Sequence, residues 1–160
     1  MSICVHRHLQ RPAASERGSI LTMGAFDGLH RGHQALIKQV VAQASESGLR
    51  SVVVTFTPPP RALFQPAQTL QLMSLHDRLA GLAELGVDQV LLLRFNHALA
   101  RMSAADFATA LKARTNAQSA WFGPGFRFGR ERAGDLQTLR DCAIDAHELS
   151  PLLDQGEAIS

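Results

Sequence analysis

The organisation of this chain is clearest in residues 24–33, which read Gly24-Ala25-Phe26-Asp27-Gly28-Leu29-His30-Arg31-Gly32-His33. The apolar run at residues 19–26 has the length of a strand, and from residue 31 to Gly48 apolar side chains recur at helical spacing. Glycines at a strand-to-helix turn let backbone N–H groups approach an anion, and the helix N-terminus adds partial positive charge. The segment therefore predicts an anion-binding turn between a first strand and a first helix.

Strands and helices alternate along the rest of the chain. Strand patterns occupy residues 51–56, 87–95, 120–122 and 144–149, and helical patterns occupy residues 74–85, 103–114 and 134–142. This alternation predicts an α/β protein with an open parallel sheet and helices on both faces. Such sheets bind ligands beyond the carboxyl ends of their strands. The residues to inspect follow the strands, at 24–33, 55–64, 94–97 and 123–135.

Composition excludes several classes of protein. The chain has 160 residues, enough for one domain, and its 46% hydrophobic and 19% charged residues are typical of a soluble globular protein. A formal net charge of +2 is too small to indicate a nucleic-acid partner. We expect no membrane association and a cytoplasmic location, because the sequence shows neither a long apolar run nor a secretory signal. Cys4 and Cys142 lie far apart, which argues against a zinc site or a disulfide framework.

His30 and His33 are expected to meet at the mouth of the first helix if that helix begins at Arg31. Two imidazoles there can donate hydrogen bonds to phosphate oxygens and stabilise charge that grows in a transition state. The structural alternative is that the glycines only shape a turn and the histidines only cap the helix. The segment matches neither the P-loop nor the dinucleotide-binding fingerprint.

The ordered motifs resemble those of a known family. Residues 22–37 (TMGAFDGLHRGHQALI) are similar to the GNFDGxHxGH segment of bacterial bifunctional riboflavin kinase/FAD synthetases, which belong to the His-x-Gly-His nucleotidylyltransferase superfamily. Residues 55–61 (TFTPPPR) resemble that family's TFxPxPR motif, and residues 123–129 (GPGFRFG) resemble its G-x-D/N-F-R-F-G motif. The resemblance covers about residues 18 to 160. It implies a Rossmann-like nucleotidylyltransferase fold and an FMN adenylyltransferase domain.

The resemblance also implies a reaction and a set of site residues. ATP and FMN would give FAD and pyrophosphate with Mg²⁺, the FMN phosphate attacking the α-phosphate of ATP in line. His30 and His33 would be the catalytic residues, and no metal ligand is assigned. The residues expected to bind the two nucleotides are Gly24, Phe26, Asp27, Gly28, Gly32, Thr55, Phe56, Pro58, Pro60, Arg61, Phe64, Gly123, Gly125, Phe126 and Arg127.

Several of these residues have a structural alternative. Four residues could form an apolar wall for the flavin ring, or could simply be the end of a strand, a stiff loop and one core Phe. They are Phe56, Pro58, Pro60 and Phe64. Arg61 could bind a phosphate or lie in solvent. Phe126, Arg127 and Phe128 could pack and present a cation to nucleotide or form a strand edge with one polar residue, and residues 130–132 are expected to be a solvated loop.

The sequence departs from the family pattern in places that bear on activity. Gly125 stands where the family usually has Asp or Asn, which puts FMN binding or rate in doubt. Residues 152–160 resemble the run into the family's ISSTRIR motif, so the chain is expected to end at Ser160, inside that motif, with a riboflavin kinase domain downstream in the parent protein. Two alternatives stay open: an impaired or non-catalytic nucleotide-binding module, and a related nucleotidylyltransferase with another phosphorylated acceptor.

Overall fold

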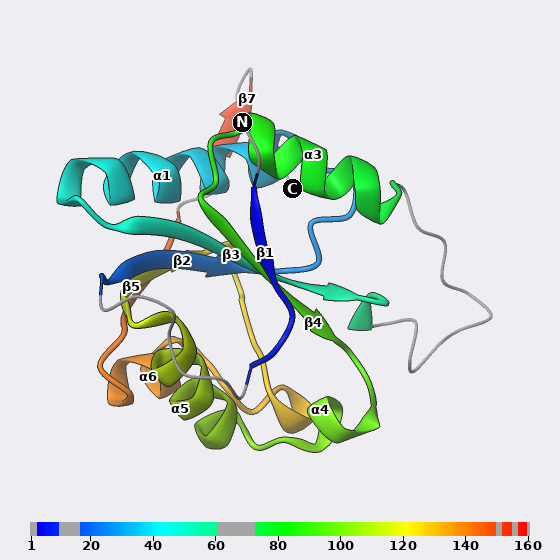
Figure 1. Ribbon diagram of the computed structural model, residues 1–160, viewed down its shortest axis with the longest axis vertical. Coiled ribbons are helices and arrows are strands. Elements are labelled where there is room, and N and C mark those ends of the chain that lie inside the picture. Colours follow the sequence, from blue (N-terminus) through cyan, green and yellow to red (C-terminus); the bar gives the residue numbers. More distant parts are fainter. Residues whose placement is uncertain (1–2, 10–16, 61–72, 150–151, 155–156, 160) are drawn as a thin grey trace.

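A parallel sheet forms the centre of the domain (Figure 1). The structure, a computed structural model, describes residues 3–9, 17–60, 73–149, 152–154 and 157–159. The sheet has six strands in the order β1-β4-β3-β2-β5-β6, and every neighbouring pair is parallel. These strands are β1 (Cys4–His6), β2 (Ser19–Met23), β3 (Arg50–Thr57), β4 (Gln89–Arg94), β5 (Ala117–Phe122) and β6 (Asp145–Glu148).

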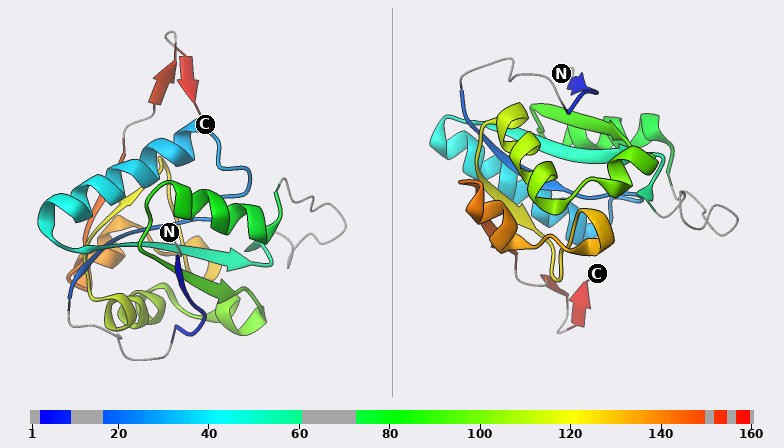
Figure 2. Two further views of the ribbon diagram at one scale, coloured as in Figure 1. Left: turned by 45° about the horizontal axis from the view of Figure 1, so that its top comes forward. Right: turned by 90° about the horizontal axis from the view of Figure 1, so that it is seen from below.

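Helices cover both faces of the sheet (Figures 1 and 2). The helices of one face are α1 (Arg31–Ser47) and α3 (Leu75–Glu84), and those of the other are α4 (His97–Arg101), α5 (Ala104–Thr115) and α6 (Leu136–Asp141). A short 3₁₀ helix, η2 (Arg130–Arg132), precedes α6, and a hairpin of β7 (Leu152–Asp154) and β8 (Glu157–Ile159) projects from the body of the domain (Figure 2). The expected fold class is confirmed. In the part of the chain that is described, none of these helices has the length and apolar character needed to cross a bilayer.

Burial on both sides explains the continuous apolar character of β3. Val52 and Val54 pack with α5 and α6, whereas Val53, between them, packs with α1 and α3. Successive side chains of a strand point to opposite faces, so a strand covered on both sides needs apolar residues at every position. The same alternation sends Phe56 to the α5 side and Thr55 to the α3 side, where each meets a different part of the site.

The helix ends follow the expected capping residues. Ser74 accepts a hydrogen bond from the backbone N–H of Asp77, and Ser103 accepts one from that of Asp106. Gly48 ends α1 in the left-handed conformation, with φ of 69°. Helix α1 begins at Arg31, as the arrangement of the two histidines required.

Short elements are where the sequence expectations fall short. Strand β1 and helix α4 were not expected, because they have three and five residues, too few to show a period. Strand β5 begins at Ala117 rather than Ala120, since Gln118 is exposed and hides the strand pattern. These differences leave the order of the sheet and the position of the predicted turn unchanged.

Candidate active site

Residues 24–33, called the histidine turn from here on, connect β2 to α1 through a tightly bent backbone. Phe26, Gly28 and Leu29 all have positive φ, at 51°, 96° and 39°. Glycine adopts this conformation at little cost, but the other two residues are held there by packing. The ring of Phe26 is 3% exposed and lies edge-on to His33, with 5.2 Å between ring centroids. The structure thus places the ring of Phe26, an expected ligand contact, in the core against His33.

The two histidines meet at the start of α1. Their rings stack with centroids 3.6 Å apart and 24° between planes. The Nδ1 atom of exposed His30 accepts hydrogen bonds from the backbone N–H groups of Gly32 at 3.2 Å and His33 at 3.4 Å. Neutral His30 consequently carries its proton on Nε2, where it can be donated to a ligand. His30 therefore caps the helix as the structural alternative expected, and its Nε2 is not used by that cap.

His33 is held in its neutral form. Burial, followed by the nearby charge of His30, lowers the pKa of His33 from 6.5 to about 4, while Asp27 opposes the shift. Its Nδ1 atom is buried and has no hydrogen-bond partner among the described residues. A neutral imidazole offers a phosphate a hydrogen bond rather than a charge. Any cation at this site must come from another group.

Asp27 contributes to the architecture of the turn. Its Oδ1 atom accepts a hydrogen bond of 2.9 Å from the backbone N–H of Met73, just before α3. The contact joins the histidine turn to the start of the helix on the same face of the sheet. Asp27 was expected to bind nucleotide, and part of its capacity as an acceptor is used within the protein.

A cavity of about 610 Å³ opens beside this turn, where β2, β3, β4 and β5 end. Its volume lies within the usual range for sites that bind small molecules. We call it the aromatic pocket, and its lining residues are Met23, Gly24, Ala25, Phe56, Pro60, Phe95, Leu99, Ala100, Phe107, Phe126, Arg127, Phe128, Gly129, Glu131 and Arg132. Five of these are expected site residues: Gly24, Phe56, Pro60, Phe126 and Arg127. Gly24 belongs to both the pocket and the histidine turn.

Two groups of phenyl rings give the pocket its shape. Phe126 stacks on Phe122 with centroids 4.1 Å apart, and it lies 5.8 Å from Phe128. Phe56 meets Phe95 edge-on at 5.8 Å. Aromatic side chains bring large apolar area and defined ring planes, which suits a flat aromatic ligand. The expectation that Phe126 is a site residue agrees with this geometry.

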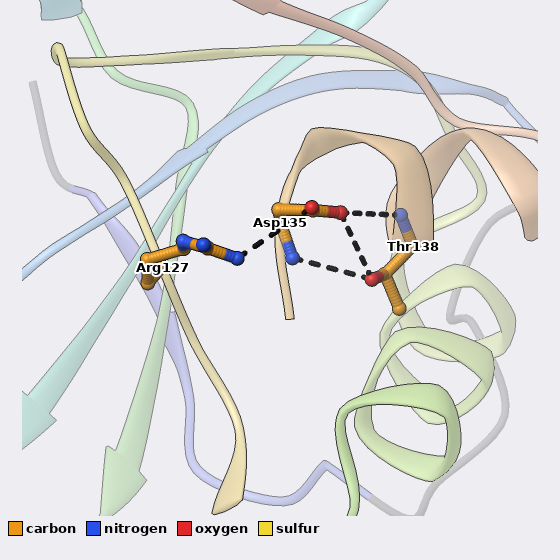
Figure 3. Close-up of polar contacts among 3 residues, drawn as sticks. All are labelled: Arg127, Asp135 and Thr138. Atoms are coloured by element: carbon orange, nitrogen blue, oxygen red, sulfur yellow. Dashed lines mark hydrogen bonds and ion pairs between the residues drawn. The ribbon is translucent and has the colours of Figure 1, made fainter. Parts of the chain in front are cut away.

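Arg127 is the cationic partner in the network of Figure 3. Its Nη1 lies 3.5 Å from Oδ2 of Asp135, and both side chains are about half exposed. The other carboxylate oxygen of Asp135, Oδ1, accepts from the backbone N–H and the hydroxyl of Thr138, while that hydroxyl accepts from the backbone N–H of Asp135. The hydrogen bonds from Thr138, more than the charge of Arg127, lower the pKa of Asp135. One oxygen thus caps α6 and the other holds Arg127 at the pocket.

Two glycines explain the close packing of the pocket loop against α5. A Cβ at Gly129 would lie 2.7 Å from the Cα of Ala104, and one at Gly134 would lie 2.8 Å from its Cβ. The loop also pairs Phe128 with Gly134 through two backbone hydrogen bonds. Neither glycine position has room for a side chain, which accounts for their places in the GPGFRFG segment and the following Gly-Asp.

The remaining expected site residues lie in different surroundings. Thr55 is fully buried, and Pro58 is exposed and not among the pocket-lining residues. A Cβ at Gly123 or Gly125 would meet nothing within 4 Å, and Gly125 has φ of 73°. Arg61 and Phe64 lie outside the described residues.

Sequence reasoning missed part of the site. The pocket-lining residues that were not expected in it include Phe95, Leu99, Phe107, Glu131 and Arg132. Phe95 follows β4 within a segment already marked for inspection, so its position was a usable signal. Glu131 and Arg132 belong to the expected solvated loop, and they are exposed as expected but also line the pocket. Phe107 carries no local signal, because α5 packing brings it to the pocket.

The fold and the site together define an α/β protein of the nucleotidylyltransferase type. Solved structures support the fold: the crystal structure of a macrolide-efflux protein from Streptococcus pneumoniae matches with a TM-score of 0.84 and 25% identity, covering 99% of this chain and 53% of that one. Pantothenate synthetase from Thermus thermophilus matches with a TM-score of 0.62 and 16% identity, covering 99% of this chain and 66% of that one.

Sequence comparisons give the family. A sequence model of the FAD synthetase family matches residues 13–160, and this chain belongs to that family. It is 37% identical to the bifunctional riboflavin kinase/FMN adenylyltransferase of Pseudomonas fluorescens, over 86% of this chain and 44% of that protein. It is 34% identical to that of Escherichia coli (strain K12), over 88% and 45%. A Geobacillus thermodenitrificans protein assigned to the same bifunctional class is 38% identical, over 88% of this chain and 85% of its own length.

The family resemblance expected from the motifs is therefore confirmed, and the family is one of nucleotidyltransferase enzymes. The chain spans about half the length of the Pseudomonas and Escherichia relatives.

Proposed function

We propose that this chain is an FMN adenylyltransferase, which transfers AMP from ATP to FMN and releases pyrophosphate. One observation carries the proposal: Gly24 and Ala25 line the aromatic pocket and also begin the histidine turn. A flat flavin in the pocket and a polyphosphate at the turn would thus meet at shared residues. The downstream riboflavin kinase domain and the cytoplasmic location belong to the same proposal.

The chemistry asks the protein mainly to position two ligands. An oxygen of the FMN phosphate attacks the α-phosphorus of ATP, a new P–O bond forms, and the bond to the pyrophosphate oxygen breaks. His30 donates from Nε2 to phosphate oxygens, since its Nδ1 is occupied by the helix cap. His33 acts as a neutral hydrogen-bond donor in the same cluster. No side chain has to form a covalent bond.

Positive charge is the second requirement, because the phosphates carry several negative charges. Arg127 and Arg132 both line the pocket, where their guanidinium groups would supply positive charge to a bound phosphate. The described residues contain no group of three or more His, Cys, Asp or Glu side chains arranged to hold a metal ion. Mg²⁺ is usually bound through one or two carboxylates together with substrate phosphates, so Mg²⁺ that arrives with ATP belongs to this proposal and would supply the remaining positive charge.

The direct test is FAD formation. The chain is incubated with ATP and FMN, and the products are separated by chromatography while pyrophosphate is measured in parallel. We expect equal amounts of FAD and pyrophosphate, and neither product with an ATP analogue whose α,β-bridge is a methylene group.

Two outcomes would favour the alternatives. Binding of ATP and FMN without any pyrophosphate release would indicate an impaired nucleotide-binding module. Pyrophosphate release with another phosphorylated acceptor, and none with FMN, would indicate a different nucleotidylyltransferase.

A further inference from the structure

Arg78 is buried more completely than an arginine usually is. It is 1% exposed and has the largest volume of the fully buried residues that the structure describes. Charged side chains are almost never fully buried unless their polar atoms find partners. Burial lowers the pKa of Arg78, and Asp27 opposes that shift electrostatically. The contacts that Arg78 makes indicate why α3 carries a guanidinium there.

Among the described residues, both hydrogen-bond acceptors of Arg78 are at the end of β3. Nη1 donates to the carbonyl oxygen of Phe56 at 2.8 Å and to the hydroxyl oxygen of Thr55 at 3.1 Å. The Thr55 hydroxyl donates in turn to the carbonyl oxygen of Ala25 at 3.1 Å. A hydroxyl has one proton to donate, so the donation from Arg78 and the donation to Ala25 use different sites on the same oxygen. The chain of contacts runs from α3 through β3 to the segment that follows β2.

The hydrogen bonds link Phe56, Arg78, Thr55 and Ala25 in that order, and the two end residues, Phe56 and Ala25, line the pocket. Ala25 and Phe56 both face the cavity, whereas Arg78 is not among the lining residues. Thr55 and Arg78 lie on the α3 side of the sheet, and the ring of Phe56 lies on the α5 side. Arg78 thus lies behind the wall of the pocket and fixes that wall through its backbone.

We propose that Arg78 is a positioning residue for FMN, which sets the distance between the Ala25 and Phe56 walls of the aromatic pocket through Thr55. The proposal rests on the proposed function, because it assigns the pocket to the flavin. Its second consequence is selectivity between substrates: loss of Arg78 should affect FMN more than ATP, because Phe56 belongs to the pocket alone whereas Ala25 is shared with the histidine turn.

A second buried arginine provides a matched control. Arg50 is 9% exposed and donates to the side-chain oxygen of Gln89 and to the carbonyl oxygens of Arg17 and Thr115. It lies at the amino end of β3, whereas the pocket is at the carboxyl end. Arg50→Met and Arg78→Met remove the same group from similar burial, and they differ in which end of the sheet is disturbed.

The experiment measures KM for FMN, KM for ATP and kcat in FAD formation, with circular dichroism as the check on folding. We expect Arg78→Met to raise KM for FMN about tenfold, the scale of one lost hydrogen bond to a charged group, and to leave KM for ATP within about twofold. Arg50→Met should lower the melting temperature and leave KM for FMN unchanged. Arg78→Lys, which restores a cationic donor, should recover part of the FMN affinity.

Three results decide against the inference. A folded Arg78→Met variant with wild-type KM for FMN overturns it, and so does an equal rise in KM for FMN in Arg50→Met. If Arg78→Met does not fold, Thr55→Val decides, because it keeps Arg78 and removes the link to Ala25; an unchanged KM for FMN in that variant also overturns the inference. A wild-type chain that neither binds FMN nor makes FAD would contradict the proposed function itself. The results for the variants bear only on the role of Arg78.

Discussion

The two parts of the candidate site, the histidine turn and the aromatic pocket, are built in different ways. The histidine turn is one continuous segment, held by a helix cap, three positive φ angles and the buried ring of Phe26. The aromatic pocket takes its rings from segments far apart in sequence, such as Phe56, Phe107 and Phe126. A continuous segment can set polar groups precisely in place, whereas rings from several elements can enclose a large flat ligand. Our proposal therefore divides the work between them, with phosphate chemistry at the turn and flavin recognition in the pocket.

The largest effect should follow from removing an imidazole at the turn. We expect His33→Ala to cost about 3 kcal/mol of transition-state stabilisation, the scale for one preorganised hydrogen-bond donor. FMN binding, measured by quenching of flavin fluorescence, should stay at the wild-type level. A fall in FMN affinity as large as the fall in turnover would contradict the separation of roles between the histidine turn and the aromatic pocket.

His30 needs a control that separates its two roles. His30→Asn keeps a side chain suited to the N-cap, while His30→Ala loses both the cap and the donor. We expect both variants to lose turnover by a similar factor, and only the alanine variant to lose about 1 kcal/mol of stability in urea unfolding. Full turnover in His30→Asn would restrict His30 to capping.

The pocket should respond in the opposite way. Phe126→Ala removes a ring that stacks on Phe122, and we expect FMN to bind with about 2 kcal/mol less free energy while ATP affinity is retained. Phe126→Leu keeps apolar volume without the ring plane, so its affinity for FMN should lie between those of the wild type and Phe126→Ala. If FMN titrations of Phe126→Ala match those of the wild type, the pocket is not the flavin site.

Stability should depend on pH through His33. Its pKa is about 4 in the folded state and near 6.5 in the unfolded chain, so the unfolded state binds a proton first as the pH falls. The stabilisation is complete above pH 6.5 and declines as the pH drops toward 4. We expect a loss of about 1–2 kcal/mol in this window after solvent screening, measured by urea unfolding. His33→Gln should lack this part of the pH dependence, and an identical profile would contradict the assignment.

Gly125, which precedes the pocket-lining residue Phe126, tests whether FMN binding would gain from a polar side chain at this position. Asparagine tolerates the left-handed conformation better than most residues, and the structure leaves open space for its side chain. We expect Gly125→Asn to strengthen FMN binding by about 1 kcal/mol, the net contribution of one hydrogen bond. Gly125→Ala supplies no such group at the same φ and should show no gain. Equal affinities in the two variants would show that a polar side chain at position 125 adds nothing to FMN binding.

The smallest effect should come from the partner of Arg127. Asp135→Asn keeps an oxygen for the cap of α6 and removes the ion pair, so we expect FMN affinity to fall by no more than about threefold. Thr138→Val weakens the cap but leaves the pair in place, and should affect stability more than affinity. A large loss of FMN affinity in Asp135→Asn would show that Arg127 depends on this contact far more than an exposed pair usually does.

The difference between a site part made from one continuous segment and one assembled from several segments also determines how much could be predicted from the sequence. The histidine turn was predictable because strand, turn and helix follow one another, and His30 and His33 are three residues apart. The part of the pocket formed by helices α4 and α5 was not, since Phe107 reaches it only through the packing of α5 on the sheet. Nothing in the local sequence states which strand ends become neighbours.

Arg78 is an intermediate case. It follows Leu75 by three residues and precedes Leu82 by four, which places it on the apolar stripe of the predicted helix. A charge on that stripe is a signal of burial, and the structure shows the burial to be complete. What the sequence could not give is the pair of acceptors at the end of β3, because their position depends on tertiary contacts.

The order of the strands also has a consequence for how the domain assembles in time. The central strand β2 pairs with β3 on one side and with β5 on the other, and the hydroxyl of Ser19 donates to the carbonyl of Thr115, 96 residues further along the chain. During synthesis, one edge of β2 thus has no partner until β5 has left the ribosome. Pairing over so long a separation is slow, and an unpaired hydrophobic strand edge invites association with other chains. Nascent domains of this kind are expected to depend on protection of that edge until β5 is added.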